Sequence, residues 1–484
     1  MKARVMKFGG TSVGNAECIG RVAEIVAAAA REGAPVVAVV SAMGGVTNRL
    51  IEAARAAERG DASAAAGLAE ALRKQHAEAI EALVGDEGRR AQLMERTAEI
   101  IEETASLCRG TTLLKELTPR ALDAISSAGE RLSARLLASA LGELGLASVV
   151  VEATELIVTD GVHGQAEPLM DETHERVAAR LPPLIEEGFV PVVTGFTGAS
   201  TEGALTTLGR GGSDYSATIL GAALDAAEVV IWTDVDGVLT ADPRLVPEAR
   251  TLREISYNEA AELAYFGAKV LHPKTLRPVA EKGIPVWIRN SFAPELPGTK
   301  ITATGHPTAR GVKAITAIKD VSLITVGGRG IVGVPGVAAK TFAAAGLARA
   351  NVLLISQSSS GNDICFIVSS EDAPRTAASL REAFAYDLRH QQVEHITINS
   401  EIAIVAVVGD MMRGTPGIAG RTFSALGRRG INIIAIAQGS SEYNVSFVVE
   451  AGAMRDAVLA VHNEFGLQRR ASRFESSEST LSKA

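Results

Sequence analysis

The sequence predicts an α/β fold built on a mainly parallel sheet, followed by a smaller repeated unit. Two observations support this prediction. Strand-like and helical stretches alternate closely over residues 4–41, which is typical of a parallel sheet. Residues 326–360 then recur without a gap as residues 407–441. A repeat of this kind indicates two copies of one supersecondary unit.

The composition is that of a globular protein with an aliphatic core. Of the 484 residues, 47% are apolar and only 4% are aromatic, and the net charge is −8. This mildly acidic chain without a basic stripe argues against nucleic acid as a partner. Cys18, Cys108 and Cys365 lack disulfide or metal spacing, which indicates a reducing compartment. Since no signal-type or membrane-length apolar run is present, we expect a cytoplasmic protein without a membrane partner.

The first elements follow from apolar runs and helix caps. Residues 4–8 predict a buried strand, Asn15 is expected to cap a helix over residues 16–32, and residues 35–41 predict a strand buried on both faces. Residues 50–108 are rich in Ala, Glu and Arg at helical spacing and predict a helical insertion or lid. Further strands are expected at residues 148–151, 190–194, 228–233 and 284–288.

The repeat defines the second half of the chain. Each copy reads as strand, Pro-Gly turn, amphipathic helix, strand, polar turn and strand. This order predicts a pair of ferredoxin-like βαββαβ modules with a ligand crevice at their shared edge. We expect a first domain at residues 1–300, a linker at 301–312, modules at 313–398 and 399–470, and a disordered tail at 471–484.

The stretch KFGG, residues 7–10, is a candidate phosphate site. Lys7 ends a strand just before a helix, where the N–H groups of Gly9, Gly10 and Thr11 are able to cradle phosphate oxygens. A P-loop has the opposite order, Gly-Lys, and that dipeptide is absent from the chain. For this motif alone, a lysine beside an ordinary tight turn is an equally good interpretation.

The stretch GRGGSDYSA, residues 209–217, is a second candidate ligand loop. Its glycines allow close approach of the backbone, and Arg210 is suited to bidentate capture of a carboxylate. Asp214 lies where a helix begins and is a candidate Mg²⁺ ligand. The alternative is a Gly-rich turn in which Asp214 only caps the helix.

Two further motifs hold charged residues near expected element ends. Thr233 and Asp234 end a strand in WTDVDGVLTADPR, where open α/β sheets bind ligands, although an acidic surface turn fits as well. Glu130 begins a helix in SSAGERLSA, where it stabilises the helix N-terminus or receives a substrate ammonium group. Glu130 and Arg210 together would bind both ends of an amino acid.

The motif FGAKVLHPKT, residues 266–275, supplies Lys269 and His272. Lys269 either lies along apolar surface or reaches a phosphate. His272 precedes a proline, which favours a structural turn residue over a catalytic base. The sequence contains no constellation of His, Cys and acid that indicates a covalent nucleophile.

Taken in this order, these stretches resemble the aspartokinase family over about residues 2–470. The motifs are KFGGTSVG, VSAMGGVTN, SSAGERLSA, TGFTGA, LGRGGSDYSA, WTDVDGVLTADPR and FGAKVLHPKT. The repeat resembles that family's paired ACT domains. The resemblance implies an amino acid kinase fold for the first domain, an αβα sandwich without a P-loop.

The resemblance implies a reaction in which ATP and L-aspartate give ADP and 4-phospho-L-aspartate, the first step towards lysine, threonine and methionine. Mg²⁺ is the implied cofactor. The acceptor carboxylate is already ionised near neutral pH, so no base is needed to activate it. Catalysis would then consist of positioning and charge neutralisation.

Residue by residue, the resemblance implies the following roles. The catalytic residues are Lys7 and Asp214, and Asp214 also lies near Mg²⁺. The aspartate contacts are Ser41, Thr47, Glu130, Phe196 and Arg210. The ATP contacts are Lys7, Gly9, Gly10, Thr233, Asp234, Leu239, Arg244 and Lys269. Leu239 stands where many members carry tyrosine, so we expect it to pack on adenine without ring stacking.

The resemblance also implies an amino-acid effector at the edges of the ACT domains. The expected contacts are Asn351, Gln357, Asn432 and Gln438. The residues around both glutamines resemble threonine-sensitive members, with lysine as the alternative effector, and the two turns differ, so both sites need not bind. The polar turns alternatively serve only to pair the modules. ACT edges also pair between chains, so we expect a homo-oligomer, a dimer or a tetramer.

Competing functions remain open. Another enzyme of the amino acid kinase fold would share the Lys-Gly-Gly loop but should lack the repeat and the pair of Glu130 and Arg210. A non-catalytic amino-acid sensor would have no reason to keep four charged residues, Lys7, Asp214, Asp234 and Lys269. A bifunctional kinase–dehydrogenase is not expected, because the chain ends soon after the second repeat.

Overall fold

The computed structural model describes residues 2–268, 271–306, 311–331, 334–357, 362–412, 414–439 and 443–468. Two compact units are present. The first comprises Met1–Val238, Thr251–Tyr257 and Val270–His306, and the second comprises Leu239–Arg250, Asn258–Lys269 and Pro307–Ala484. The units therefore interleave along the chain. The domain boundaries expected from the sequence stay predictions, and the expected tail at 471–484 lies outside the described residues.

The first unit is built on an eight-stranded sheet in the order β3-β5-β2-β1-β8-β10-β11-β9. Every neighbouring pair is parallel except β10 and β11, so the predicted mainly parallel sheet is confirmed. The strands are β1 (Arg4–Phe8), β2 (Val36–Val40), β3 (Ser148–Val151), β5 (Val190–Thr194), β8 (Glu228–Thr233), β9 (Glu254–Ser256), β10 (Val286–Asn290) and β11 (Thr299–Thr302).

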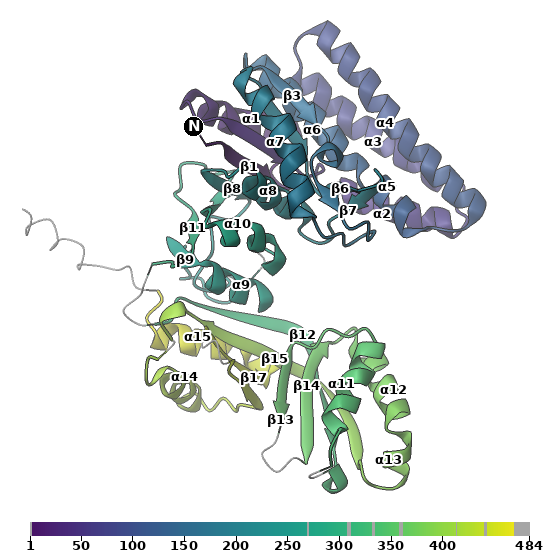
Figure 1. Cartoon of the computed structure of the whole chain (residues 1–484). Helices are drawn as coiled ribbons and strands as arrows, with labels where there is room; N and C mark the ends of the chain where they lie inside the picture. The colour runs from purple at the N-terminus through teal and green to yellow at the C-terminus, as the bar shows by residue number, and fades with distance from the viewer. Residues whose placement is uncertain are drawn as a thin grey trace, which may run out of the picture. The chain divides into compact units, whose positions relative to one another are not determined.

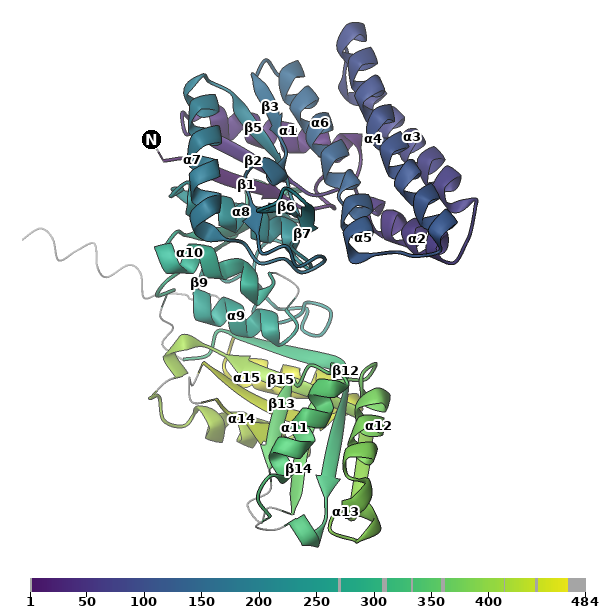
Figure 2. The same ribbon diagram turned by 45° about the vertical axis from the view of Figure 1, so that its right-hand side comes forward.

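Helices cover both faces of this sheet (Figure 2). On one face α1 (Ala16–Arg31) and α6 (Ala128–Glu143) pack together over a core that includes Met6 and Phe8. On the other face α8 (Gly212–Ala223) lies against Val229, with α7 (Met170–Glu186) and α10 (Arg277–Lys282) beside it. Asn15 caps α1 as predicted, because its side chain accepts a hydrogen bond from the N–H of Cys18.

Residues 46–126 form four helices joined by short turns, in the part of the chain where the sequence predicts a helical insertion. The helices are α2 (Val46–Glu58), α3 (Ala64–Leu83), α4 (Glu87–Leu114) and α5 (Pro119–Ser126). Figure 1 shows α3 and α4 side by side as a long pair. Whether this pair moves as a lid stays a prediction.

Short elements complete the first unit. A small three-stranded sheet has the order β4-β6-β7. Its strands are too short and polar to give an alternating pattern, and the sequence analysis missed all three. The elements are β4 (Val158–Thr159), β6 (Thr197–Ser200), β7 (Leu205–Thr207) and the 3₁₀ turns η1 (Ala153–Glu155) and η2 (Pro273–Leu276).

The second unit contains one six-stranded antiparallel sheet in the order β13-β14-β12-β15-β17-β16. The strands are β12 (Ala314–Gly327), β13 (Leu354–Gln357), β14 (Asp363–Ser369), β15 (His395–Val408), β16 (Ala435–Ala437) and β17 (Asn444–Glu450). The helices are α11 (Val337–Leu347), α12 (Ala373–Ala383), α13 (Ala385–Arg389), α14 (Ile418–Gly427) and α15 (Met454–Glu464), and the 3₁₀ turns are η3 (Arg329–Ile331), η4 (Asp410–Met412) and η5 (Ala451–Ala453).

The two copies of the repeat have the same local structure. The starts of α11, β13, β14 and α12 recur 81 residues later as the starts of α14, β16, β17 and α15. The copies are nevertheless joined through their long strands, because β12 and β15 pair along both halves. Residues 314–318 of β12 pair with residues 404–408 of β15 and so add a strand to the second copy. The predicted ferredoxin-like fold is confirmed, with this shared strand as an addition.

Helix α9 (Tyr257–Tyr265) is fastened to the sheet of the second unit. Its Glu259 forms a fully buried ion pair with Lys313, with a distance of 2.6 Å between Oε2 and Nζ. Its Glu262 accepts a hydrogen bond of 2.6 Å from the side chain of Asn444. Helix α9 therefore belongs to the second unit by its contacts, although residues of the first unit flank it in the chain.

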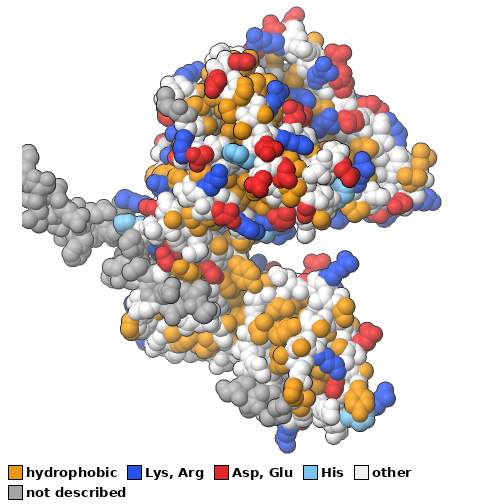
Figure 3. Space-filling model, in the orientation of Figure 1, with side chains coloured by type: hydrophobic (Ala, Val, Ile, Leu, Met, Phe, Trp, Pro, Cys, Tyr) orange, Lys and Arg blue, Asp and Glu red, His pale blue; other side chains and the backbone are white. Residues whose placement is uncertain are grey.

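None of the helices in the described ranges combines the length and the apolar character that a bilayer span requires. On the face seen in Figure 3, acidic and basic side chains are interspersed over the first unit. The expected cytoplasmic location stays a prediction.

Candidate active site

A cavity of about 840 Å³ opens at the carboxyl ends of β1 and β2 and at the first turns of α6 and α8. This is the edge at which open α/β sheets bind ligands. Eleven of the residues predicted from the sequence line it: Lys7, Gly9, Gly10, Thr11, Ser41, Thr47, Glu130, Phe196, Arg210, Asp214 and Thr233. The structure thus brings these residues together, and their individual roles stay predictions.

Lys7 and Asp214 form an ion pair inside the cavity. Lys7 is the penultimate residue of β1, and Asp214 lies in the first turn of α8. Both are largely buried, with Lys7 only 8% exposed. A Cβ atom on Gly9 would lie 3.3 Å from Nζ of Lys7, so glycine leaves room beside the ammonium group.

The predicted backbone cradle is present only in part. The N–H of Gly9 already donates to the carbonyl of Trp232 at 3.3 Å, so it is not available as expected. Among the described residues, the N–H groups of Gly10 and Thr11 have no hydrogen-bond acceptor. Two backbone donors therefore remain beside Lys7.

Glu130 is a buried carboxyl group with one unused oxygen. Its Oε1 accepts a hydrogen bond from the N–H of Ala42 at 3.1 Å. Its Oε2 has no partner among the residues that the structure describes. Burial raises the pKa of Glu130 to about 8, although hydrogen bonds from the backbone of Ala42 and Glu130 and the charge of Lys7 oppose this rise. A cation that enters the cavity would pair with Oε2 of Glu130 and would stabilise the negative charge of its carboxylate.

Tight packing fixes the helix turn that carries Glu130. A Cβ atom on Gly129 would lie 2.5 Å from Cβ of Ala42, so only glycine lets α6 approach the loop after β2 this closely. Gly129 lies within the motif SSAGERLSA, but the motif does not indicate this contact.

A second tight contact joins Phe196 and Gly212 near Arg210 in the chain. Phe196 has a φ of +70°, a strained value for a residue other than glycine, and its N–H donates to Oγ of Ser216 at 3.0 Å. A Cβ atom on Gly212 would lie 2.6 Å from the Phe196 ring. Arg210 is exposed between Gly209 and Gly211, and its guanidinium has no partner among the described residues.

Several predicted nucleotide contacts are not part of this cavity. Asp234 follows β8, does not line the cavity, and accepts a hydrogen bond from Thr233 at 3.1 Å. Leu239 and Arg244 belong to the second unit, where Arg244 pairs with Asp242. Lys269 lies outside the described residues. Nucleotide binding by these residues stays a prediction.

His272 has the structural role that the sequence favoured. Its Nδ1 accepts a hydrogen bond from the N–H of Lys274 at 3.4 Å and so caps the short turn η2. Burial, followed by the charges of Lys274 and Arg210, lowers the pKa of His272.

Two other polar cavity residues were not predicted from the sequence. Asn48 and Ser213 also line the cavity. Both belong to the motifs quoted above, so a position within a motif was the only available signal.

The residue types fit a magnesium ion that arrives with a nucleotide. Within the described ranges, no group of three or more His, Cys, Asp or Glu side chains forms a metal centre. Asp214 supplies one carboxylate next to Lys7 in the cavity. Protein Mg²⁺ sites often use one or two carboxylates and complete the shell with water and phosphate oxygens.

The four predicted effector residues lie in equivalent positions of the second unit. Gln357 ends β13 and Gln438 follows β16, and Asn351 and Asn432 precede these strands. All four side chains are exposed. Parts of both polar turns, at residues 358–361 and 440–442, lie outside the described residues. Effector binding stays a prediction.

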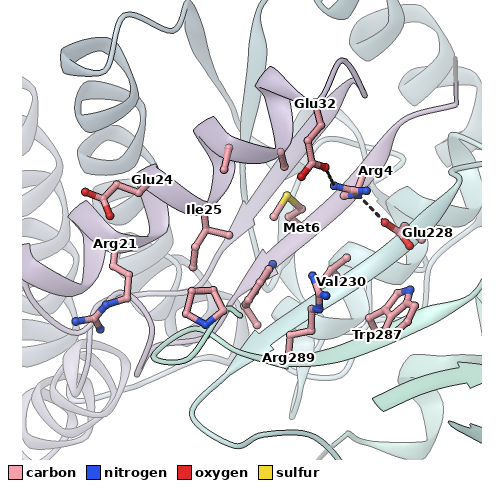
Figure 4. Close-up of a pocket in the computed structure, with 14 residues that line it drawn as sticks. Arg4, Met6, Arg21, Glu24, Ile25, Glu32, Glu228, Val230, Trp287 and Arg289 are labelled. Atoms are coloured by element: carbon pink, nitrogen blue, oxygen red, sulfur yellow. Dashed lines mark hydrogen bonds and ion pairs between the residues drawn. The ribbon is translucent and has the colours of Figure 1, made fainter. Parts of the chain in front are cut away.

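A second cavity, of about 500 Å³, lies between α1 and strands β1, β8 and β10 (Figure 4). It contains none of the predicted site residues. Arg4 in this cavity bonds to Glu228 at 2.6 Å and to Glu32 at 3.2 Å. Its acidic and basic residues are equal in number, so they do not favour a phosphate ligand, and the first cavity remains the candidate active site.

Comparisons with known proteins agree with the fold and the motifs. A model described as the amino acid kinase family matches residues 2–290, and an ACT domain model matches residues 324–384 and 405–465. The chain is 34% identical to chloroplastic aspartokinase 1 of Arabidopsis thaliana, over 95% of this chain and 80% of that protein.

A bifunctional relative and a solved structure also match the chain over most of its length. Chloroplastic bifunctional aspartokinase/homoserine dehydrogenase 1 of Arabidopsis thaliana is 37% identical over 96% of this chain, which spans 51% of that relative. The chain thus spans about half the length of such relatives. The E. coli aspartokinase III structure in complex with aspartate and ADP matches with a TM-score of 0.79 and 29% identity, over 96% of this chain and 99% of that one.

Proposed function

The chain belongs to the aspartokinase family, and from this premise we propose that it transfers the γ-phosphoryl group of ATP to the β-carboxylate of L-aspartate. The observation that supports this most directly is the buried Glu130, whose Oε2 has no partner among the described residues. It shares one cavity with the Lys7–Asp214 pair and with Arg210, whose guanidinium also lacks a described partner. That set suits an amino acid with an additional carboxylate.

In this proposal each side chain has a distinct task. Glu130 binds the α-ammonium group of aspartate, and Arg210 binds a carboxylate in bidentate fashion. Lys7 offsets the charge that develops on the transferring phosphoryl oxygens. Asp214 would hold Mg²⁺, which would neutralise phosphate charge there. The attacking β-carboxylate needs no base, because it is ionised near neutral pH.

The test is trapping of the acyl phosphate with hydroxylamine in the presence of ATP, Mg²⁺ and aspartate. We expect aspartyl hydroxamate from the wild-type protein. Its rate should fall by about 100-fold or more in Lys7→Ala, because removal of one charge-stabilising group typically has this effect. Lys2→Ala is the matched control, since Lys2 forms an exposed ion pair with Asp225. A folded wild-type protein that yields no hydroxamate would favour the non-catalytic sensor.

We further propose that threonine binds at the ACT edges and lowers this activity. Support comes from the equivalent, exposed positions of Gln357 and Gln438. Threonine and lysine should each be titrated into the assay with wild type, Gln357→Ala and Gln438→Ala. Inhibition by lysine alone would overturn the choice of effector. Loss of the response in only one variant would identify a single working site.

Assembly through the ACT edges is part of the same proposal. Strands β13 and β16 are the outer strands of the six-stranded sheet, and their Ile355 and Ile436 are 51% and 47% exposed. Edge strands with exposed apolar side chains favour pairing with another chain. Light scattering that gives a monomer mass at micromolar concentration would contradict the proposed homo-oligomer.

A further inference from the structure

Asp123 is a buried carboxylate that lies outside the candidate cavity, and its side chain forms three hydrogen bonds to two separate segments near the cavity. It belongs to α5 and is only 2% exposed. Its Oδ1 accepts a hydrogen bond of 2.6 Å from Oγ1 of Thr207. Its Oδ2 bonds to Nδ1 of His163 at 2.7 Å and accepts from the N–H of Gly164 at 3.1 Å. Hydrogen bonds to a buried charged acceptor are among the stronger ones in proteins.

Two of these bonds connect Asp123 to the backbone that precedes Arg210. Thr207 is the last residue of β7 and lies three residues before Arg210. Gly164 belongs to a loop that packs against Gly209, since a Cβ atom on Gly209 would lie 3.0 Å from the Gly164 carbonyl oxygen. Gly209 has a φ of +77°, so the backbone just before Arg210 is fixed from both sides by groups that Asp123 holds.

The backbone of Asp123 is connected to the helix that carries Glu130. Its carbonyl accepts a hydrogen bond from the N–H of Ser127 at 3.1 Å, at the joint between α5 and α6. Glu130 follows in the first turn of α6, where its side chain bonds to Ala42. Asp123 is therefore attached both to the segment that carries Glu130 and to the segment that carries Arg210.

On the basis of the proposed function, we propose that Asp123 is a positioning residue that fixes Glu130 and Arg210 relative to each other and thereby selects aspartate over glutamate. Glu130 would hold the α-ammonium group and Arg210 the α-carboxylate, so together they would fix Cα of the acceptor at a set distance from the phosphoryl group beside Lys7. Glutamate is longer by one methylene group, so its side-chain carboxylate is placed correctly for attack only if Cα is held further away. Discrimination of one methylene group typically amounts to about 10- to 200-fold in enzymes. A rigid connection between the two binding residues provides such discrimination without touching the substrate.

The experiment compares hydroxamate formation from aspartate and from glutamate in three variants. Asp123→Asn keeps the size of the side chain but weakens all three hydrogen bonds. Thr207→Val removes the hydroxyl group that donates to Oδ1 of Asp123 and leaves Asp123 itself unchanged. Thr206→Val is the matched control, because Thr206 is the adjacent buried residue of β7 and its hydroxyl bonds to Thr159 at 2.8 Å instead.

We expect the aspartate-to-glutamate ratio of kcat/KM to fall by about tenfold in Asp123→Asn, at the lower end of methylene discrimination. Thr207→Val should shift the ratio in the same direction, through a higher KM for aspartate. The effects of the two substitutions should not be additive in the double variant, since both weaken the bond between Asp123 and Thr207. The KM for ATP and the ratio in Thr206→Val should stay at the wild-type values.

The outcomes separate this inference from the proposed function. If the wild-type protein makes no aspartyl hydroxamate, the proposed function fails, whatever the variants do. If the wild type is active and both variants keep its ratio while unfolding at lower temperature, Asp123 is only structural and the inference is overturned. If Asp123→Asn does not fold, Thr207→Val decides, since it leaves the carboxylate and its other two bonds in place.

Discussion

Glu130 combines a proposed role in substrate binding with a raised pKa, and this gives a prediction at the scale of one residue. Burial raises the pKa of Glu130 to about 8, so at pH 6.5 the group in the free protein is mostly protonated. Binding of an ammonium group favours the carboxylate. The KM for aspartate should therefore fall as pH rises from 6.5 to 8, by at most about tenfold per pH unit. Steady-state kinetics at several pH values measure this.

The variant Glu130→Gln and a stability measurement serve as controls. In Glu130→Gln the KM for aspartate should be higher and independent of pH. In the free protein, the folded group keeps its proton up to about pH 8, whereas the unfolded group loses it near 4.5. Its contribution to the free energy of unfolding should decline as pH rises through this window, and Glu130→Gln should lack the decline. A KM for aspartate that does not change with pH in the wild type would contradict the prediction.

Most residues of the candidate site were predictable, and Asp123 was not, for a physical reason. Lys7, Glu130 and Arg210 stand at strand or helix ends within compact motifs, where function and backbone geometry leave a local pattern. Asp123 obtains its role from partners 40 to 84 residues away in the chain. The local sequence pattern around Asp123 does not indicate hydrogen bonds to residues so far away in the chain.

At the scale of elements, the contact between α6 and the loop after β2 can be tested with two glycines of one helix. Gly129→Ala would put a methyl group 2.5 Å from Cβ of Ala42 and so push the turn that carries Glu130 out of position. We expect a loss of stability of about 1–3 kcal/mol, as for other overpacked sites, and a higher KM for aspartate. Chemical denaturation and kinetics measure the two effects.

Gly142→Ala in the same helix is the control. The nearest atom to its new Cβ would be the flexible end of Arg89, at 3.6 Å. Alanine is the better helix former, so this variant should gain about 0.5–1 kcal/mol and keep its kinetics. Equal behaviour of the two variants would show that the approach of α6 to Ala42 does not position Glu130.

The attachment of α9 to the second unit gives a further prediction. Glu259→Gln would leave the ammonium group of Lys313 buried without its carboxylate, since the two side chains are 0% and 2% exposed. Breaking a buried pair in this way typically costs about 3–5 kcal/mol in the free energy of unfolding. Urea denaturation measures the cost, and the double variant Glu259→Gln/Lys313→Met should recover part of it.

An exposed ion pair supplies the comparison for Glu259→Gln. Lys2 and Asp225 are 59% and 58% exposed, so Lys2→Met should change stability by less than about 1 kcal/mol. If Glu259→Gln were no more costly than Lys2→Met, the buried pair would not fasten α9.

Elements with a strong local signal were predictable, and elements that depend on pairing with another strand were not. The apolar runs of β1, β2, β5 and β8 predicted those strands, because strands buried on both faces need continuous apolar residues. Strands β6 and β7 have the sequences TGAS and LTT and exist because they pair with each other. The repeat predicted two modules, but it could not reveal that residues 314–318 complete the second one.

At the scale of the whole molecule, the interleaved units predict the behaviour of a fragment. Ala241 and Val246 precede residue 307 in the chain, yet they are buried in the core of the second unit. A fragment of residues 1–306 would expose both and would leave Glu259 without Lys313. We expect it to aggregate, because exposed apolar surface promotes association. Size-exclusion chromatography measures this, and a monomeric fragment with cooperative unfolding would contradict the prediction.

The strand shared by the two repeat copies has a consequence for synthesis on the ribosome. Residues 314–318 emerge before their partners at 404–408 of β15, so this piece of β12 waits unpaired while about ninety further residues are translated. At about 5–20 residues per second, the wait lasts about 5–20 seconds. During that interval the nascent chain offers an open backbone edge to chaperones or to neighbouring nascent chains. Proteolysis of chains arrested near residue 400 should cut at this edge, and chains arrested after the second copy has emerged should resist.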